Sequence, residues 1–223
     1  MRTLTYYVAV SLDGRIAAAD GDYSAFPTEG DHLDALAAEF PETFPVPARA
    51  ALGLTDRGTR FDTVLMGWDT YAVGLPFGLV APYALRTVVF TRDPARRRAE
   101  ARDAAPAETP DAADAVTFTD GDPATVVRRL KEEVPAGDAG GADTPESARR
   151  GLWLCGGGSL AAALLPEIDR LVLKVNPVLL GGAGIPLFAG GVEEAGAGFR
   201  LESSRSFRSG VVISEYPRAE QEE

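Results

Sequence analysis

The sequence predicts an α/β fold in which a mainly parallel β-sheet is covered by helices on both faces. Short runs rich in β-branched and aromatic residues alternate along the chain with runs of helical periodicity. This alternation is typical of parallel sheets. The last two strand-like runs follow each other across a link that contains Gly210. We therefore expect an antiparallel hairpin at the C-terminal edge of the sheet.

The N-terminal half opens with a strand, a loop and a helix. Residues 4–10 read as a buried strand because the run ends at the turn signal Asp13-Gly14. Apolar residues at helical spacing, bounded by Pro41, predict a helix over residues 31–40. Two further apolar runs and one short polar segment then predict a strand over 61–67, a helix over 69–72 and a strand over 86–91.

The C-terminal half continues the alternation. Val126, Val127 and Leu130 share one face of a helix predicted over residues 123–133. Short apolar runs predict the remaining strands, and a run of small and apolar residues after the glycines predicts the last helix. These elements are strands over 115–119, 151–155 and 170–175, a helix over 159–165, and the hairpin strands over 199–204 and 211–216.

Length and composition predict a single domain over residues 1–217. Residues 93–114 and 135–150 are poor in apolar side chains, so we expect mobile surface loops there, and a disordered tail over 218–223. The net charge of −11 disfavours nucleic-acid binding. The sequence has neither a long apolar run nor a secretory signal, which predicts a cytoplasmic protein without a membrane segment. Cys155 is the single cysteine, so a disulfide and a thiolate metal site are excluded, and no metal is expected.

Three glycines stand where the strand over 151–155 passes into a helix. Gly156, Gly157 and Gly158 would let a dinucleotide pyrophosphate approach the backbone at a helix start, with Ser159 as the helix cap and Leu160 following it. The alternative is an ordinary strand-to-helix turn, which also favours glycine and serine. The spacing is not that of a Rossmann motif.

A second junction of the same kind follows the strand over 61–67. There Gly67 is followed by Trp68, Asp69 and Thr70, again a glycine before a helix start. Two such junctions in one sheet could hold opposite sides of an extended cofactor. Thr91 and Arg92 come at the end of the next strand and are further candidates for cofactor contact.

Four segments together resemble the dihydrofolate reductase and RibD C-terminal reductase families. The segments are 11–17 (Ser-Leu-Asp-Gly-Arg-Ile-Ala), 64–71 with Gly-x-x-Thr-Tyr, 152–160 with the glycine triplet, and 176–188 (Asn-Pro-Val-Leu-Leu-Gly-Gly-Ala-Gly-Ile-Pro-Leu-Phe), which is similar to the family pattern Pro-Val-x-x-Gly-x-Gly-x-Pro-x-Phe. The resemblance implies a dihydrofolate reductase-like three-layer fold with about eight strands, mostly parallel, and a homodimer. It also places Gly67 and Thr70 at the cofactor phosphates. In much of the family an arginine after the glycine pairs with the NADP 2′-phosphate, but here the residue is Trp68, so NADPH is favoured and NADH stays an alternative.

The resemblance also suggests catalytic candidates. Ala9 and Ile16 suit the apolar wall against which a nicotinamide is held, although both could be plain core. Asp13 would face the active-site opening, or be a turn residue before Gly14. Glu29 and Asp31, together with Asp34, are candidates for the carboxylate that contacts the substrate, with a helix cap as the alternative for Asp31.

Other side chains are given less specific roles. His32 is expected at the surface or partly buried, and Cys155 as a buried apolar residue. Arg15, Arg57 and Arg60 are candidates for a substrate phosphate.

The predicted function is therefore an NAD(P)H-dependent oxidoreductase. The protein resembles a stand-alone form of 5-amino-6-(5-phosphoribosylamino)uracil reductase of riboflavin biosynthesis, and its expected substrate is a small molecule. The alternatives are a dihydrofolate reductase-type activity, or a non-catalytic dinucleotide-binding module of the same fold.

Overall fold

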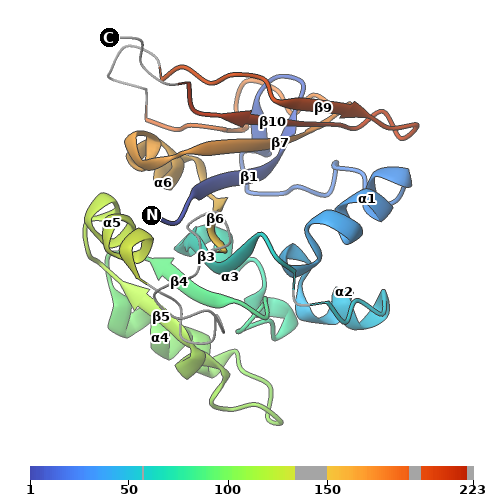
Figure 1. The fold of residues 1–223 in the computed structure, drawn as a ribbon. Helices are drawn as coiled ribbons and strands as arrows, with labels where there is room; N and C mark the ends of the chain where they lie inside the picture. The colour runs from blue at the N-terminus through green and yellow to red at the C-terminus, as the bar shows by residue number, and fades with distance from the viewer. Residues whose placement is uncertain (57, 134–149, 191–196, 220–223) are drawn as a thin grey trace. The chain divides into compact units, whose positions relative to one another are not determined.

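The computed structural model describes residues 1–56, 58–133, 150–190 and 197–219 (Figure 1). The strands form an eight-stranded sheet in the order β5-β4-β3-β6-β1-β7-β10-β9, and a small second sheet pairs β2 with β8. The chain divides into two compact units, which are described separately. Unit 1 comprises Met1–Thr3 and Glu39–Trp153, and unit 2 comprises Leu4–Ala38 and Leu154–Glu223.

Unit 1 contains three parallel strands that follow one another in the chain. They are β3 (Phe61–Gly67), β4 (Arg86–Phe90) and β5 (Val116–Thr119). Its helices are α2 (Val46–Ala51), α3 (Trp68–Ala72), α4 (Pro94–Asp103) and α5 (Pro123–Glu132). β3 and β4 are buried along most of their length. The rings of Phe40 and Trp153 both stack on that of Phe61, with ring centroids 6.3 Å apart in each case.

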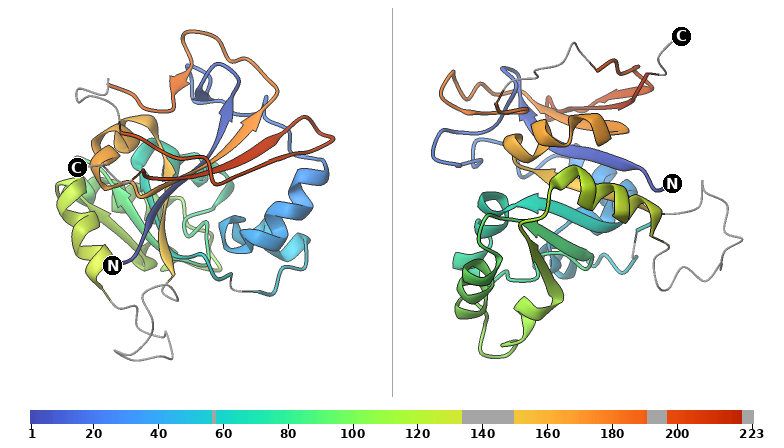
Figure 2. Two further views of the ribbon diagram at one scale, coloured as in Figure 1. Left: turned by 45° about the horizontal axis from the view of Figure 1, so that its top comes forward. Right: turned by 90° about the vertical axis from the view of Figure 1, so that its left-hand side faces the viewer.

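Unit 2 contains the other half of the strand order. β1 (Leu4–Ser11) pairs in parallel with β7 (Arg170–Asn176), and β10 (Val212–Pro217) pairs antiparallel with both β7 and β9 (Ser203–Ser206). Figures 1 and 2 show β1, β7 and β10 side by side. Helices α1 (Asp31–Glu39) and α6 (Gly158–Ala163) and the short strands β2 (Arg15–Ala17) and β8 (Ile185–Pro186) complete the unit. β6 (Gly151–Gly156) contributes residues to both units.

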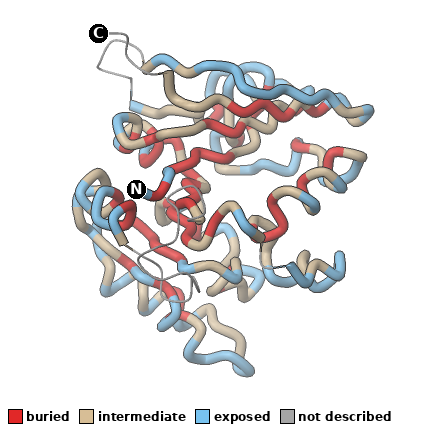
Figure 3. The backbone as a smooth tube through the Cα atoms, viewed as in Figure 1, coloured by how far each residue is buried: buried red, intermediate tan, exposed pale blue. Residues whose placement is uncertain are grey.

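The predicted fold class is confirmed. The large sheet has eight strands, the strands of the β3-β4-β5 group and the β1-β7 pair are parallel, and the C-terminal hairpin is antiparallel. The predicted strands and helices are found within two residues of their predicted bounds, except that the strand predicted over 199–204 begins only at Ser203 and continues to Ser206. Buried stretches follow the strands (Figure 3), as the apolar runs predicted. The single-domain prediction stays a prediction.

The prediction of a loop over residues 93–114 was wrong for its helical part. α4 spans Pro94–Asp103, and a 3-10 helix spans Ala112–Ala115. The carboxylate of Asp93 caps α4 by accepting a hydrogen bond from the Arg96 N–H, and proline occupies the first turn, where no N–H is needed. Arginine–glutamate pairs along the helix and one fully buried alanine stabilise a segment of low hydrophobicity.

Three smaller differences concern short elements and the tail. β2, β8 and α2 were not predicted because elements of two to six residues carry little periodicity. Arg218, predicted to be in the disordered tail, donates from its backbone to Asp169 and from its side chain to Ile168. The predicted loop over 135–150 lies outside the described residues except for Arg150, and of the predicted tail only Arg218 and Ala219 are described.

Candidate functional site

The carboxyl ends of the parallel strands in unit 1 bring several candidate cofactor residues together. Gly67, the last residue of β3, lies opposite Phe90, the last residue of β4. Trp68 and Thr91 therefore follow neighbouring strands at one edge of the sheet. Ligands of open α/β sheets bind at this edge. Thr91 accepts a hydrogen bond from the Asp93 N–H at 3.3 Å, and Arg92 is exposed.

The first turn of α3 supplies the other candidates at this edge. Gly67 is the residue before the helix and has extended backbone, with φ −74° and ψ 162°. Trp68, Asp69 and Thr70 form the helix start, and Asp69 is exposed. α3 is only five residues long, so its amide groups are a modest source of positive potential.

Arg97 is a residue of this edge that the sequence analysis did not identify. Its guanidinium carbon lies 4.3 Å from the centroid of the Trp68 ring, and its Nη1 lies 2.6 Å from a carboxylate oxygen of Glu100. Arg97 belongs to the basic run Arg96–Arg98, and the structure places it on Trp68, the tryptophan that replaces the expected arginine. A basic run directly after a strand was the signal available in the sequence.

In the glycine triplet of unit 2, the first and third positions require glycine for different structural reasons. Gly156 has φ +146°, a conformation that other residues rarely adopt, and the peptide bond to Gly157 is cis. Gly158 is buried, and a β-carbon on it would lie 2.3 Å from the carbonyl oxygen of Pro186. The third glycine is therefore required by the packing of the chain against residues 186–189.

The predicted cap of α6 was wrong. Gly157 is the residue before the helix, no side chain caps it, and Ser159 is an exposed residue inside the first turn. The turn enters α6 one residue earlier than predicted because Gly158 already has helical conformation. Leu160 is buried, with 8% of its surface exposed, as expected for an apolar residue on the inner side of a helix.

Asp13 holds two loops of unit 2 together. Its carboxylate accepts hydrogen bonds from the Ser11 hydroxyl at 2.6 Å, the Leu180 N–H at 3.1 Å and the Gly181 N–H at 2.7 Å. These donors, the Ser11 hydroxyl first, lower the pKa of Asp13 to about 2. A carboxylate held in this way stays ionised at neutral pH. Its predicted catalytic role stays a prediction, but the low pKa disfavours donation of a proton.

We predict that replacing Asp13 with asparagine loosens the loop around residue 180. An amide offers one acceptor oxygen where the carboxylate offers two. Hydrogen exchange of the Leu180 and Gly181 amides should therefore accelerate at neutral pH. In the unmodified protein the same protection should fade as the pH falls from about 4 towards 2, because the pKa is lower in the folded state than its ordinary value of 3.8.

A matched control is Asp20→Asn, because Asp20 accepts a single backbone hydrogen bond in an exposed turn of the same unit. Unchanged exchange at residues 180 and 181 in Asp13→Asn would contradict the assigned role.

Asp31 and Glu29 line a hollow of about 460 Å³ at the start of α1. Asp31 accepts hydrogen bonds from the Arg208 N–H at 2.9 Å and the Ser209 N–H at 3.1 Å. The Arg208 backbone contact, followed by that of Ser209 and the Arg208 side chain, lowers the pKa of Asp31. Glu29 is exposed at the rim. Asp31 therefore docks the start of α1 on the β9–β10 turn, and whether either carboxylate is catalytic stays a prediction.

His32 is fully buried, which corrects the expectation of a surface or partly buried residue. Its Nδ1 lies 3.0 Å from the Ser209 hydroxyl, and its ring packs 6.4 Å from that of Phe207. Burial and the neighbouring Lys174 lower the pKa of His32, while the Pro27 backbone and Asp31 act in the opposite direction. The histidine is therefore held neutral on the buried side of α1, the helix to which it belongs.

Ala9 and Ile16 lie in unit 2 at the end of β1 and in β2, and both are partly buried. Ala9 stands opposite Lys174 of β7. Of the arginines considered for a substrate phosphate, Arg60 lies over the Phe40 ring at 4.3 Å and near Glu39, and Arg57 lies outside the described residues. The Nε of Arg15 is buried without a hydrogen-bond partner.

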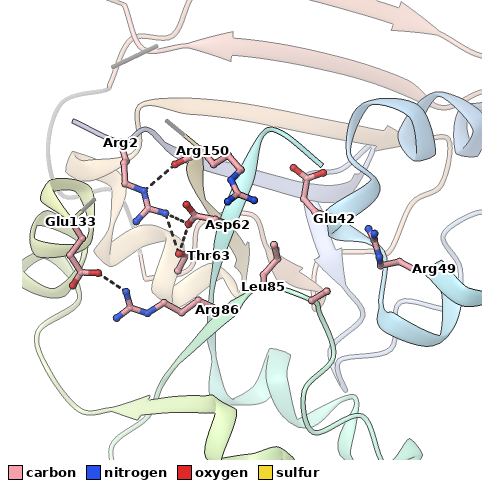
Figure 4. A pocket seen from close by; sticks show the side chains of 10 residues that line it. Arg2, Glu42, Arg49, Asp62, Thr63, Leu85, Arg86, Glu133 and Arg150 are labelled. Carbon is pink, nitrogen blue, oxygen red and sulfur yellow. Dashed lines mark hydrogen bonds and ion pairs between the residues drawn. The ribbon is translucent and has the colours of Figure 1, made fainter. Parts of the chain in front are cut away.

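A charged cavity of about 620 Å³ lies in unit 1 at the opposite, amino-terminal ends of the strands (Figure 4). Its walls carry two ion pairs, Arg2–Asp62 and Arg86–Glu133. Glu42 also lines it, and its carboxylate accepts hydrogen bonds from the backbone N–H groups of Arg60 at 2.9 Å and Phe61 at 2.8 Å. These charges are largely used within the protein. We therefore assign the cavity to the stability of unit 1.

Comparison with known proteins gives a consistent result. No family model matches the chain. The chain is 29% identical over 224 residues to the uncharacterized protein YwjB of Bacillus subtilis (strain 168), with 98% of this chain and 99% of that protein aligned. No helix in the described ranges is both long and apolar enough to cross a bilayer.

Two solved structures show the fold. A putative riboflavin biosynthesis protein from Shewanella sp. PV-4 superposes with a TM-score of 0.62 at 22% identity, covering 99% of this chain and 100% of that one. The diaminohydroxyphosphoribosylaminopyrimidine deaminase/5-amino-6-(5-phosphoribosylamino)uracil reductase of Thermotoga maritima superposes with a TM-score of 0.58 at 15% identity, covering 98% of this chain and 57% of that one. The structural neighbours are RibD-type, pyrimidine reductase-like proteins, and the chain has their dihydrofolate reductase-like fold.

Proposed function

We propose that this protein is a nicotinamide-dependent reductase that passes a hydride to a small heterocyclic substrate, in the manner of a 5-amino-6-(5-phosphoribosylamino)uracil reductase. The observation that carries the proposal is the agreement in fold with the Shewanella riboflavin biosynthesis protein over the full length of both chains. The four sequence segments that resemble this group support it. We also propose that the protein is a cytoplasmic homodimer.

The carboxyl edge of unit 1 fits the adenosine end of NADPH. Trp68 offers an aromatic surface for an adenine ring. A tryptophan cannot neutralise the 2′-phosphate of NADPH, but the guanidinium of Arg97, which lies on the Trp68 ring, can do so. Exposed Arg92 adds a second positive charge after the neighbouring strand. Bound NADPH would supply the hydride, and these residues would bind and orient its far end.

Fluorescence titration tests cofactor binding. The chain has two tryptophans. Trp153 is 4% exposed and packed against Tyr83, so quenching by a cofactor should come from Trp68. Quenching by NADPH should persist in Trp153→Phe and be lost in Trp68→Phe. If neither NADPH nor NADH binds by calorimetry, the proposal fails. Loss of NADPH absorbance with 5-amino-6-(5-phosphoribosylamino)uracil would separate an enzyme from a binding module.

We predict that Arg97→Ala weakens NADPH binding far more than NADH binding. A hydrogen bond between charged groups contributes about 1.5–3 kcal/mol, which corresponds to roughly 10- to 100-fold in affinity. NADH lacks the 2′-phosphate, so its affinity should change little. The control is Arg102→Ala, which removes an exposed arginine of the same helix that pairs with Asp114. Equal weakening of both cofactors would contradict the assignment of Arg97 to the 2′-phosphate.

A further inference from the structure

The chain uses lysine very sparingly. Of its 22 lysine and arginine residues, only Lys131 and Lys174 are lysines. An arginine keeps its proton under all conditions that proteins experience, whereas a lysine in an apolar setting can release one. A lysine that lies among apolar neighbours in a chain otherwise supplied with arginine is therefore a candidate for proton transfer.

Lys174 lies in the middle of the unit 2 sheet. It stands on β7 directly opposite Ala9 of β1 on one side and Ile213 of β10 on the other. Side chains of directly opposed residues point to the same face of a sheet. Lys174 therefore shares a face with Ala9, the residue that the sequence analysis assigned to the nicotinamide wall.

Lys174 is partly buried, and nothing in the described part of the chain holds its ammonium by a hydrogen bond or ion pair. Burial lowers the pKa of Lys174 below its ordinary value of 10.5. Strand alternation puts the charged or titratable groups Tyr7 of β1, Arg170 of β7, Glu215 of β10 and Arg205 of β9 on its face, and His32 of α1 interacts with Lys174 electrostatically. Glu215 lies 3.3 Å from Arg170, so an arginine already pairs with it.

Asn176 provides a second unpartnered polar group on the same face, two residues along β7. It is fully buried, and its Nδ2 donates to the carbonyl oxygens of Val10 at 3.2 Å and Lys174 at 2.9 Å. Its Oδ1 is buried without a partner. A buried acceptor that lacks a donor is costly unless a ligand pairs with it, and the partly buried Lys174 lies two residues away on the same strand. The two groups match a ligand that presents an acceptor next to a donor, as the edge of a lactam heterocycle does.

Two of the carboxylates considered for proton transfer, Asp13 and Asp31, are committed elsewhere. Asp13 accepts three hydrogen bonds and Asp31 accepts hydrogen bonds from two backbone N–H groups, and the pKa of each is lowered. Both are therefore ionised at neutral pH and have no proton to give. The reduction of a C=N or C=O group needs a proton as well as a hydride.

We propose that Lys174 is the catalytic residue that donates this proton, and that Asn176 accepts a hydrogen bond from the ring of a lactam-bearing substrate. This inference rests on the proposed reductase function. As the hydride of NADPH reaches the electrophilic carbon, the electron pair of the double bond moves to the heteroatom. The heteroatom takes a proton from the Lys174 ammonium, whose N–H bond breaks and leaves a neutral amine. The substrate is reduced, NADPH is oxidised, and the amine regains a proton from water.

The ionisation of Lys174 can be measured without cofactor or substrate. With 13C-labelled lysine the protein gives side-chain NMR signals from only two residues, and Lys131→Arg assigns them by removing one. We expect the Lys174 signal to titrate clearly below pH 10.5, its ordinary pKa. A midpoint at or above that value would overturn the proposal, whether or not the protein binds NADPH.

Turnover then tests the role itself, with NADPH and 5-amino-6-(5-phosphoribosylamino)uracil. Lys174→Arg keeps the positive charge but cannot release a proton, and Lys174→Met removes both. Loss of a general acid costs roughly 10²- to 10⁴-fold in rate, so kcat should fall by this factor in both variants. NADPH affinity should be unchanged, and Lys131→Arg should behave as wild type.

The outcomes separate the two proposals. Absence of NADPH binding in the wild-type protein refutes the reductase function and, with it, this role of Lys174. Cofactor binding and turnover that survive in Lys174→Arg refute the role of Lys174 alone, because a charged positioning residue would be satisfied by arginine. A fall in kcat that Lys174→Arg does not rescue supports proton donation. If the wild-type protein binds NADPH but does not turn over this substrate, the lysine titration decides alone.

Discussion

Replacing Arg2 with methionine is expected to lower the free energy of unfolding by about 3–5 kcal/mol, the usual cost of removing one partner of a buried ion pair. Only 1% of the Arg2 side chain is exposed, and it pairs with Asp62, whose side chain is 11% exposed. The guanidinium also donates to the carbonyl oxygens of Arg150 at 3.0 Å and Leu130 at 3.2 Å. Without Arg2, Asp62 would remain as an uncompensated charge at the edge of the cavity in Figure 4. Urea unfolding followed by circular dichroism measures the change.

The same cavity supplies the control for this prediction. Arg86 pairs with Glu133, but the two side chains are 46% and 34% exposed. Exposed pairs contribute roughly 0–1 kcal/mol, so Arg86→Met should hardly change stability. The double variant Arg2→Met/Asp62→Leu should recover much of the loss, because it removes both buried charges. A loss in Arg2→Met no larger than that in Arg86→Met would show that the Arg2 pair is not buried in solution.

Replacing Gly158 with alanine is expected to destabilise unit 2 by about 1–3 kcal/mol or more, the cost of overpacking a filled interior. The new methyl group would lie 2.3 Å from the carbonyl oxygen of Pro186 and 3.3 Å from the Cβ of Ala189. A backbone carbonyl cannot rotate away as a flexible side chain can. Residues 186–189 would therefore have to move. This movement would strain the hydrogen bond that the Ala189 N–H donates to the Gly158 carbonyl oxygen at 3.0 Å. Thermal unfolding and urea titration measure the effect.

Gly182→Ala is the matched control, since a β-carbon there meets nothing within 4 Å. Its backbone needs no left-handed conformation, so the change should be neutral or slightly stabilising. The pair of variants also separates packing from cofactor contact at the glycine triplet. Cofactor affinity should fall in Gly158→Ala together with stability. A fall in affinity at full stability would show that Gly158 instead touches the ligand directly.

Local patterns were sufficient for most of the strands and helices. The runs over residues 4–10, 61–67 and 170–175 carry enough β-branched and aromatic residues to be recognised as strands without any tertiary information. α4 was missed because its stability comes from a capping aspartate and arginine–glutamate pairs rather than from an apolar stripe. β2 and β8 were missed because they pair across about 170 residues and are only two or three residues long.

The amino-acid sequence by itself determined the α/β class, the order of the strands along the chain and the two glycine junctions, because these depend on side-chain periodicity and on residues close in sequence. Only the tertiary structure decided what the candidate residues contact. The N–H groups of residues 180 and 181 donate hydrogen bonds to the Asp13 carboxylate, Arg97 lies on the Trp68 ring, and Lys174 stands opposite Ala9 in the sheet. These neighbours are 29 to 168 positions apart in the chain. They meet because strand pairing and connecting turns bring them together, and no local pattern encodes such a meeting.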